Sequence, residues 1–124
     1  LILGGLLDRH PRLKLVLCHG GGFLPYQIGR MQLGYTRGTD KVAQLKLDGP
    51  QAYLRLLYYD TVTLNTGSLR LLLGLVGAGH IMLGSDYVWE PMGGDLMGAV
   101  EAAGLTPQER GHICTDTALE LFRQ

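Results

Sequence analysis

The sequence lacks an excess of either charge and any run of basic residues. Eleven Lys and Arg residues balance eleven Asp and Glu residues, and both kinds are scattered along the chain. A protein that binds a nucleic-acid backbone needs clustered cations to neutralise phosphates. Nucleic acid is therefore not an expected partner.

Cysteines are few, and long hydrophobic runs are missing. Cys18 and Cys114 lie far apart in apolar stretches, which predicts buried free thiols and a reducing compartment such as the cytoplasm. The apolar residues 1–7 are too few to span a bilayer, so no membrane association is expected. Leu1 falls within an apolar helical pattern with no capping residue before it, which predicts that the natural chain continues upstream.

The chain does contain three short runs with the apolar, aromatic and β-branched content of buried strands, at residues 13–18, 56–62 and 80–83. Hydrophobic residues at helical spacing follow each run, in residues 23–31, 69–76 and 96–103. Strands that alternate with helices indicate parallel pairing and right-handed crossovers. We therefore predict one α/β domain, although three strands cannot close a barrel.

Capping residues predict where several helices begin. Asn65, with Thr66 and Ser68, offers caps to the helix after the second strand. Residues 106–109 have the pattern of a capping box with proline in the first turn, and Pro50 predicts a further short helix. Thr115 or Asp116 would cap a last helix.

Two residues suited to metal or proton chemistry occupy equivalent places in this pattern. His19 follows the first predicted strand and Asp86 follows the third, so in a parallel sheet both would lie at the carboxyl edge, where active sites form. A loop histidine often only forms hydrogen bonds, and an aspartate after serine often only closes a turn. The residues alone leave both interpretations open.

Two other kinds of site are excluded. The run from His19 to Gly22 is similar to the oxyanion loop of esterases, but no Gly-x-Ser-x-Gly nucleophile follows, and Ser85 lacks the flanking glycines. The same glycines are not followed by Lys-Ser/Thr at phosphate-loop spacing. Neither a serine hydrolase nor a nucleotide-binding protein is predicted.

The segment His10–Arg30, HPRLKLVLCHGGGFLPYQIGR, resembles a signature of the amidohydrolase-related family, in its branch of aminocarboxymuconate-semialdehyde and γ-resorcylate decarboxylases. Residues 58–61, 83–87 and 115–122 match the same family in the same order. The resemblance implies that residues 1–124 form the C-terminal part of one metal-dependent (β/α)8, or TIM, barrel.

The resemblance also implies roles for three residues. His19 would be a catalytic histidine after barrel strand six, and Asp86 a catalytic carboxylate and ligand of a divalent metal, most often zinc, after strand eight. Arg30 would bind a substrate carboxylate, in some members from across a dimer interface, which implies a homodimer or higher homo-oligomer. The remaining metal ligands of the family, all histidines, would lie upstream. Asp60 could orient a loop, and Trp89 could line the substrate pocket or simply pack.

We therefore expect a metal-dependent carboxy-lyase that removes CO2 from a small unsaturated or aromatic carboxylate. One alternative keeps the fold and metal but makes the reaction a hydrolysis, because a metal-activated water serves both outcomes. A second alternative is an inactive fragment, whose exposed strand edges would favour association.

Overall fold

A computed structural model describes residues 1–38, 44–88 and 96–123. Its centre is a three-stranded parallel sheet in the order β1 (Val16–Leu17), β2 (Tyr58–Asp60), β3 (Ile81–Met82). Val16 pairs with Tyr58, and Asp60 pairs with Met82. The predicted α/β fold with parallel strands is confirmed, although each strand is shorter than its apolar run.

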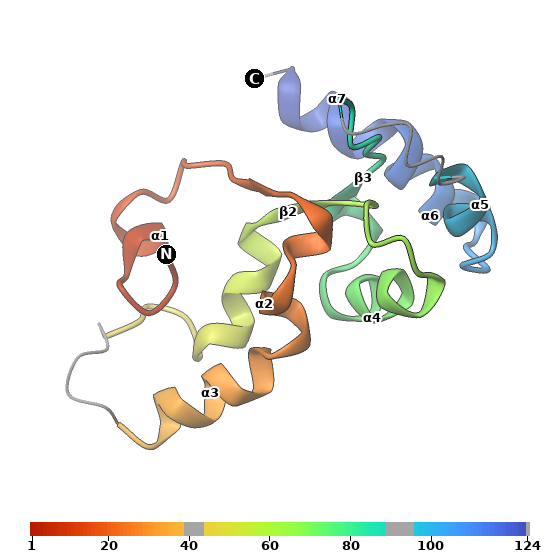
Figure 1. Ribbon diagram of the computed structural model, residues 1–124. Coiled ribbons are helices and arrows are strands. Elements are labelled where there is room, and N and C mark those ends of the chain that lie inside the picture. Colours follow the sequence, from red (N-terminus) through yellow and green to blue (C-terminus); the bar gives the residue numbers. More distant parts are fainter. Residues whose placement is uncertain (39–43, 89–95, 124) are drawn as a thin grey trace.

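Helices connect the strands and extend on both sides of the sheet. The segments α1 to α3 lie on one side in Figure 1 and α5 to α7 lie on the other, with α4 beside the sheet. The helical segments are α1 (Leu6–Arg9), η1 (His19–Gly21), α2 (Phe23–Tyr26), α3 (Ile28–Thr36), η2 (Pro50–Leu56), α4 (Thr66–Val76), η3 (Ala78–His80), α5 (Leu96–Glu101), α6 (Pro107–Gly111), η4 (His112–Asp116) and α7 (Thr117–Phe122). No helix in these described ranges is long and apolar enough to cross a membrane.

Local capping explains where α4 and α6 begin, as predicted. The Asn65 side chain accepts a hydrogen bond of 2.9 Å from the backbone N–H of Ser68, which satisfies one of the free donors of α4. In α6 the Thr106 hydroxyl accepts from the Glu109 backbone, and the Glu109 carboxylate accepts from the Thr106 backbone. Both halves of the capping box are therefore formed.

The predicted cap of the last helix is wrong. Asp116 has helical backbone angles, φ −67° and ψ −43°, and its side chain caps nothing. The π-helical turn η4 runs directly into α7, so the backbone N–H groups there already have partners within the helix. Thr117 begins α7, is buried, and donates a hydrogen bond to the carbonyl of Ala78. This contact ties the last helix to η3.

The most deeply buried strand side chains lie on one face of the sheet. Leu17, Tyr59 and Ile81 share a face, and Tyr59 and Ile81 are completely buried among the helices. Tyr59 donates a hydrogen bond of 3.0 Å to the carbonyl of Leu54, and burial raises the pKa of its hydroxyl. Other completely buried core residues are Tyr53, Leu57, Leu69 and Val100.

The opposite face of the sheet is open at β1, which corrects two predictions. Val16 is 40% exposed, so the first strand is not buried on both faces. Cys18 continues the same alternation and is exposed, whereas Cys114 is half-buried; both thiols are free, as predicted, but Cys18 is not buried. A parallel sheet normally has both faces covered, whereas the described residues leave this face open at β1.

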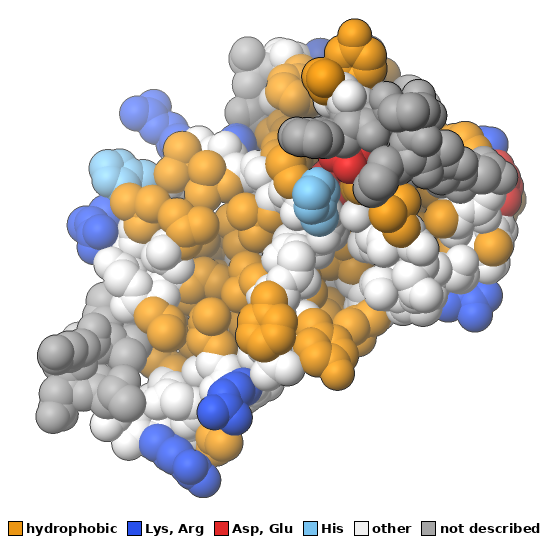
Figure 2. Space-filling view, viewed as in Figure 1, with side chains coloured by type: hydrophobic (Ala, Val, Ile, Leu, Met, Phe, Trp, Pro, Cys, Tyr) orange, Lys and Arg blue, Asp and Glu red, His pale blue; other side chains and the backbone are white. Residues whose placement is uncertain are grey.

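Hydrophobic side chains are exposed over the middle of the face seen in Figure 2. Two of the largest exposed side chains are aromatic residues of α2, Phe23 at 72% and Tyr26 at 71% exposure. Patches of this kind in a soluble protein indicate a surface that another polypeptide or a ligand covers. Phe23 and Tyr26 follow closely after the carboxyl end of β1, where His19 lies.

Candidate active site

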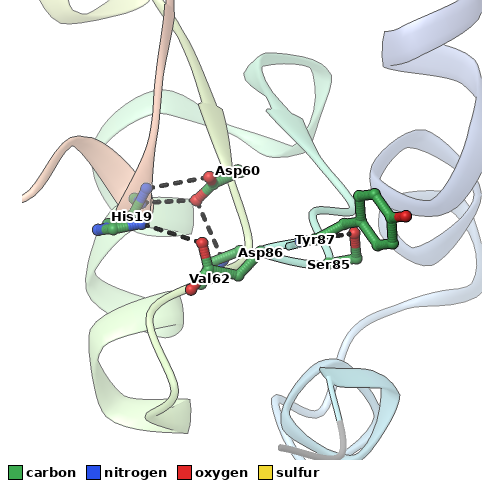
Figure 3. Close-up of polar contacts among 7 residues, drawn as sticks. His19, Asp60, Val62, Ser85, Asp86 and Tyr87 are labelled. Atoms are coloured by element: carbon green, nitrogen blue, oxygen red, sulfur yellow. Dashed lines mark hydrogen bonds and ion pairs between the residues drawn. The ribbon is translucent and has the colours of Figure 1, made fainter. Parts of the chain in front are cut away.

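His19 and Asp86 meet at the carboxyl edge of the sheet, as the strand pattern predicts. His19 follows β1 and Asp86 follows β3, and their side chains point toward one another (Figure 3). Nε2 of His19 lies 3.4 Å from Oδ1 of Asp86. The imidazole is 63% exposed and the carboxylate 32% exposed, so the pair can reach solvent and a small ligand.

Both residues have backbone angles that are unusual for residues other than glycine. The φ angle is 56° at His19 and 53° at Asp86, and Leu64 is the only other non-glycine residue with positive φ in the described part of the chain. Each such residue costs on the order of 1–3 kcal/mol and persists only where the surroundings impose it. Because strain of this kind concentrates at functional sites, it favours a functional interpretation of the pair over a loop histidine and a turn aspartate.

The loop after β1 keeps positive φ angles through Gly20, Gly21 and Gly22, at 59°, 79° and 57°. A Cβ atom on Gly20 would lie 2.6 Å from the Thr63 side chain, and one on Gly21 would lie 2.8 Å from the Tyr59 ring. Glycine is therefore required at both positions for conformation and for space.

The end of β2 contacts the loops that carry both site residues. The Asp60 carboxylate accepts hydrogen bonds from the backbone N–H groups of His19, at 3.0 Å, and Gly20, at 2.8 Å. Thr61, which is buried, accepts a hydrogen bond of 3.2 Å from the backbone N–H of Gly84. From the sequence, the position of Asp60 at a strand end was the only signal of this arrangement, and Thr61 carried none.

A hollow of about 410 Å³ opens beside His19, between α2 and α4. Its lining is mixed, with hydroxyl groups among apolar side chains, and includes Tyr26, Val62, Thr63, Ser68 and Leu72. The hollow is large enough for a small ring compound. His19 lies on the rim of this hollow.

Arg30 does not join this group within the described chain. It lies in α3, is exposed, and no polar contact among the described residues connects it to His19 or Asp86. In Figure 1, α3 continues beyond α2, away from the sheet. Trp89 lies outside the described residues.

The described residues do not assemble a complete metal site: no group of three or more His, Cys, Asp or Glu side chains lies close enough to share an ion in residues 1–38, 44–88 and 96–123. Asp86 nevertheless fits one position of such a site. Its carboxylate is half-buried, and in the described chain only its Oδ1 atom has a polar side-chain neighbour. A carboxylate oxygen in this environment is a suitable ligand for a divalent cation.

Comparison with known proteins shows the family and the fold to which the chain belongs. The chain is 31% identical over 98% of its length to 2-amino-3-carboxymuconate-6-semialdehyde decarboxylase of Dictyostelium discoideum, of which it spans 34%. It is similar to the crystal structure of 5-carboxyvanillate decarboxylase LigW from Sphingomonas paucimobilis, with a TM-score of 0.84 and 27% identity over 98% of this chain and 37% of that one.

A second 5-carboxyvanillate decarboxylase, from Novosphingobium aromaticivorans, has a TM-score of 0.83 at 20% identity, covering 99% of this chain and 36% of its own. That crystal structure contains manganese and 4-hydroxy-3-methoxy-5-nitrobenzoic acid. The chain thus spans about a third of the length of these proteins, and the fold is part of a TIM barrel, as predicted. The family model for amidohydrolases matches residues 1–124, so this chain belongs to the amidohydrolase family.

Proposed function

We propose that the whole protein is a metal-dependent decarboxylase of a small aromatic or unsaturated carboxylate, and that residues 1–124 form the C-terminal part of its barrel. The observation that carries this proposal is the His19–Asp86 pair, 3.4 Å apart and held in left-handed backbone at the carboxyl ends of parallel strands. Family membership and the decarboxylase relatives support the reaction class.

In the proposed reaction His19 is the proton carrier. Its imidazole would protonate the carbon atom that bears the carboxylate, the bond between that carbon and the carboxylate would then break, and its electrons would be left on the protonated carbon as CO2 departs. Asp86, whose Oδ1 lies 3.4 Å from Nε2 of His19, would orient the imidazole toward the substrate. The exposed imidazole would take its next proton from solvent.

We propose that Asp86 also holds a divalent metal, with the remaining ligands outside the described residues. When bound, the ion would supply a positive charge that orients the substrate and stabilises negative charge on its oxygens. We expect zinc, on the basis of the ligand types that the resemblance implies, and manganese is the alternative because the Novosphingobium decarboxylase structure contains it. Metal analysis of the purified whole protein distinguishes the two ions.

The test is CO2 release by the whole protein from a panel of aromatic and unsaturated carboxylates. His19→Asn and Asp86→Asn should each lower kcat by on the order of 10² or more, the usual contribution of a positioned proton-transfer group. His10→Asn is the matched control, because His10 is exposed and precedes β1 at the other end of the sheet. Hydrolysis products without CO2, or full activity of His19→Asn, would contradict the proposal.

We propose that Arg30 binds the carboxylate of a substrate held in the active site of a second subunit. Arg30 is exposed and lies in α3, which runs away from the sheet in Figure 1, and this position favours a site on a partner chain. A planar fork of donors suits a carboxylate. This assignment requires a homodimer or a higher homo-oligomer.

Subunit mixing tests the position of Arg30. Arg30→Met and His19→Asn should each be nearly inactive, but mixed dimers contain one intact site, so equal mixtures should recover about a quarter of the wild-type activity. Arg37→Met, an exposed change at the C-cap of the same helix, should have no effect. If mixing recovers nothing while both proteins form dimers, Arg30 does not act across the interface.

The cytoplasm is the proposed location, because Cys18 and Cys114 are free thiols and Cys18 is exposed.

A further inference from the structure

The carboxylate of Asp60 binds three backbone N–H groups from two different loops. Oδ2 accepts from His19 at 3.0 Å, while Oδ1 accepts from Gly20 at 2.8 Å and from Val62 at 3.1 Å. Figure 3 shows this carboxylate beside the backbone of His19, whose side chain extends toward Asp86. A half-buried carboxylate with three backbone donors is a fixed anchor, since hydrogen bonds to an ionised acceptor are the stronger kind.

The backbone around His19 has the form that such an anion requires. Successive backbone N–H groups in a turn can form one concave site that attracts an anion. His19 and Gly20 form that site, with φ of 56° and 59°, and Asp60 supplies the anion. The carboxylate thus offsets the strain of a non-glycine residue in left-handed backbone at His19.

Asp60 also lies against the loop that carries Asp86. A Cβ atom on Gly84 would come within 2.9 Å of Cβ of Asp60 and of the Val62 side chain, so the two backbones approach as closely as glycine permits. Thr61 adds the hydrogen bond to the Gly84 backbone. The end of the central strand therefore contacts both loops and sets the separation of the pair.

We propose that Asp60 is the positioning residue of this site, and that its carboxylate holds His19 in the left-handed backbone that directs the imidazole at Asp86. Asp60 acts through the backbone of His19 and touches neither the imidazole nor, in the proposed reaction, the substrate. Its catalytic consequence rests on the proposed function, whereas the geometric claim does not.

Asp60→Asn is the direct perturbation, because asparagine has nearly the same shape. Its side chain keeps one acceptor oxygen and replaces the other with an NH2 group, which would face a backbone donor. Asp48→Asn makes the same chemical change at an exposed aspartate and is the matched control. Thr61→Val is the second variant, because it removes the acceptor for Gly84 and leaves Asp60 intact.

The readout is amide hydrogen exchange in the whole protein, followed by NMR, which requires no activity. In Asp60→Asn the amides of His19 and Gly20 should exchange on the order of tenfold faster or more, as expected for loss of a hydrogen bond to a charged acceptor. The Tyr58 amide, bonded to the carbonyl of Leu15, should remain protected. In Thr61→Val the Gly84 amide should exchange faster, with His19 and Gly20 unchanged.

Two results would overturn the proposal. Unchanged exchange at His19 and Gly20 in Asp60→Asn would mean that the carboxylate does not hold the loop. Equal loss of protection at every amide, Tyr58 included, would make Asp60 a general stabilising residue. Scalar couplings from the His19 and Gly20 nitrogens to the carboxyl carbon of Asp60, both present in the wild type and in Asp48→Asn and at least one absent in Asp60→Asn, add a direct signature of the bonds.

In the whole protein the same variant should lower kcat with little change in KM, because the proton carrier is misdirected while substrate binding is retained. If the exchange result holds and no decarboxylation is found for the wild type, the proposed function fails and the positioning role stands.

Discussion

Replacement of three glycines by alanine separates backbone strain from steric conflict at the site. Gly20 combines both, since its φ is 59° and its added Cβ atom would lie 2.6 Å from Cγ2 of Thr63. Gly38 has φ of 66° and open space around it, and Gly74 lies within α4 with neither constraint. The three substitutions are chemically identical, so differences among them report on the structure.

The magnitudes follow from the geometry. Left-handed backbone costs alanine about 1–2 kcal/mol, which is the loss of unfolding free energy expected for Gly38→Ala. Gly20→Ala adds about 1–3 kcal/mol of overpacking, for a total of about 2–5 kcal/mol. The Thr63 side chain cannot simply rotate away, because its hydroxyl donates a hydrogen bond of 3.1 Å to the carbonyl of Asn65. Gly74→Ala should instead stabilise the protein by about 0.5–1 kcal/mol, because alanine is the better helix former.

The assay is urea unfolding at equilibrium, followed by far-UV circular dichroism, for the wild type and each variant. A rescue variant isolates the steric part: Thr63→Ser removes Cγ2, so in the Gly20→Ala background it should recover about 1–3 kcal/mol and leave the strain. The reasoning is refuted if Gly20→Ala is no worse than Gly38→Ala, if Thr63→Ser gives no recovery, or if Gly74→Ala destabilises.

Three further predictions concern the core and titratable groups. Tyr59→Phe removes the buried hydroxyl that donates to Leu54 and should lower the unfolding free energy by about 1 kcal/mol in the same urea assay; no loss would mean that the bond contributes nothing. Burial lowers the pKa of His80 below its ordinary 6.5, so the folded state binds fewer protons and stability should fall as the pH falls below 6.5; His80→Asn should flatten that slope. Hydrogen bonds from the backbone and hydroxyl of Thr106 lower the pKa of Glu109 below its ordinary 4.5. The stability that the Glu109 carboxylate contributes is therefore present above pH 4.5 and is lost as the pH falls through the lowered value. Urea unfolding at pH 6 and pH 3 should show this loss in the wild type and not in Glu109→Gln.

Local sequence was sufficient wherever a few neighbouring residues control the outcome. Asn65 predicted the start of α4, and the capping box of Thr106 and Glu109 predicted the start of α6, because a cap involves side chains three residues apart. The alternation of strand-like and helix-like runs predicted the parallel sheet. It therefore also placed His19 and Asp86 at the same edge, since carboxyl ends of parallel strands lie together.

Predictions failed where the outcome depended on what packs against a segment. An apolar run predicted that β1 is buried on both faces, yet the exposure of Val16 and Cys18 depends on which polypeptide covers that face. In the same way, Thr115 and Asp116 resemble caps in sequence, but η4 and α7 form one continuous helical run that requires none.

The sequence by itself determined the fold class, the family and the identity of the two residues that meet at the site, because these depend on periodicity, local caps and motif. Only the tertiary structure decided that His19 and Asp86 adopt left-handed backbone, and that Asp60 binds N–H groups 41 and 40 residues away in the chain. It also decided that Arg30 lies apart from them. The physical reason is that these features depend on hydrogen bonds and close packing between segments distant in sequence, which no pattern of neighbouring residues records.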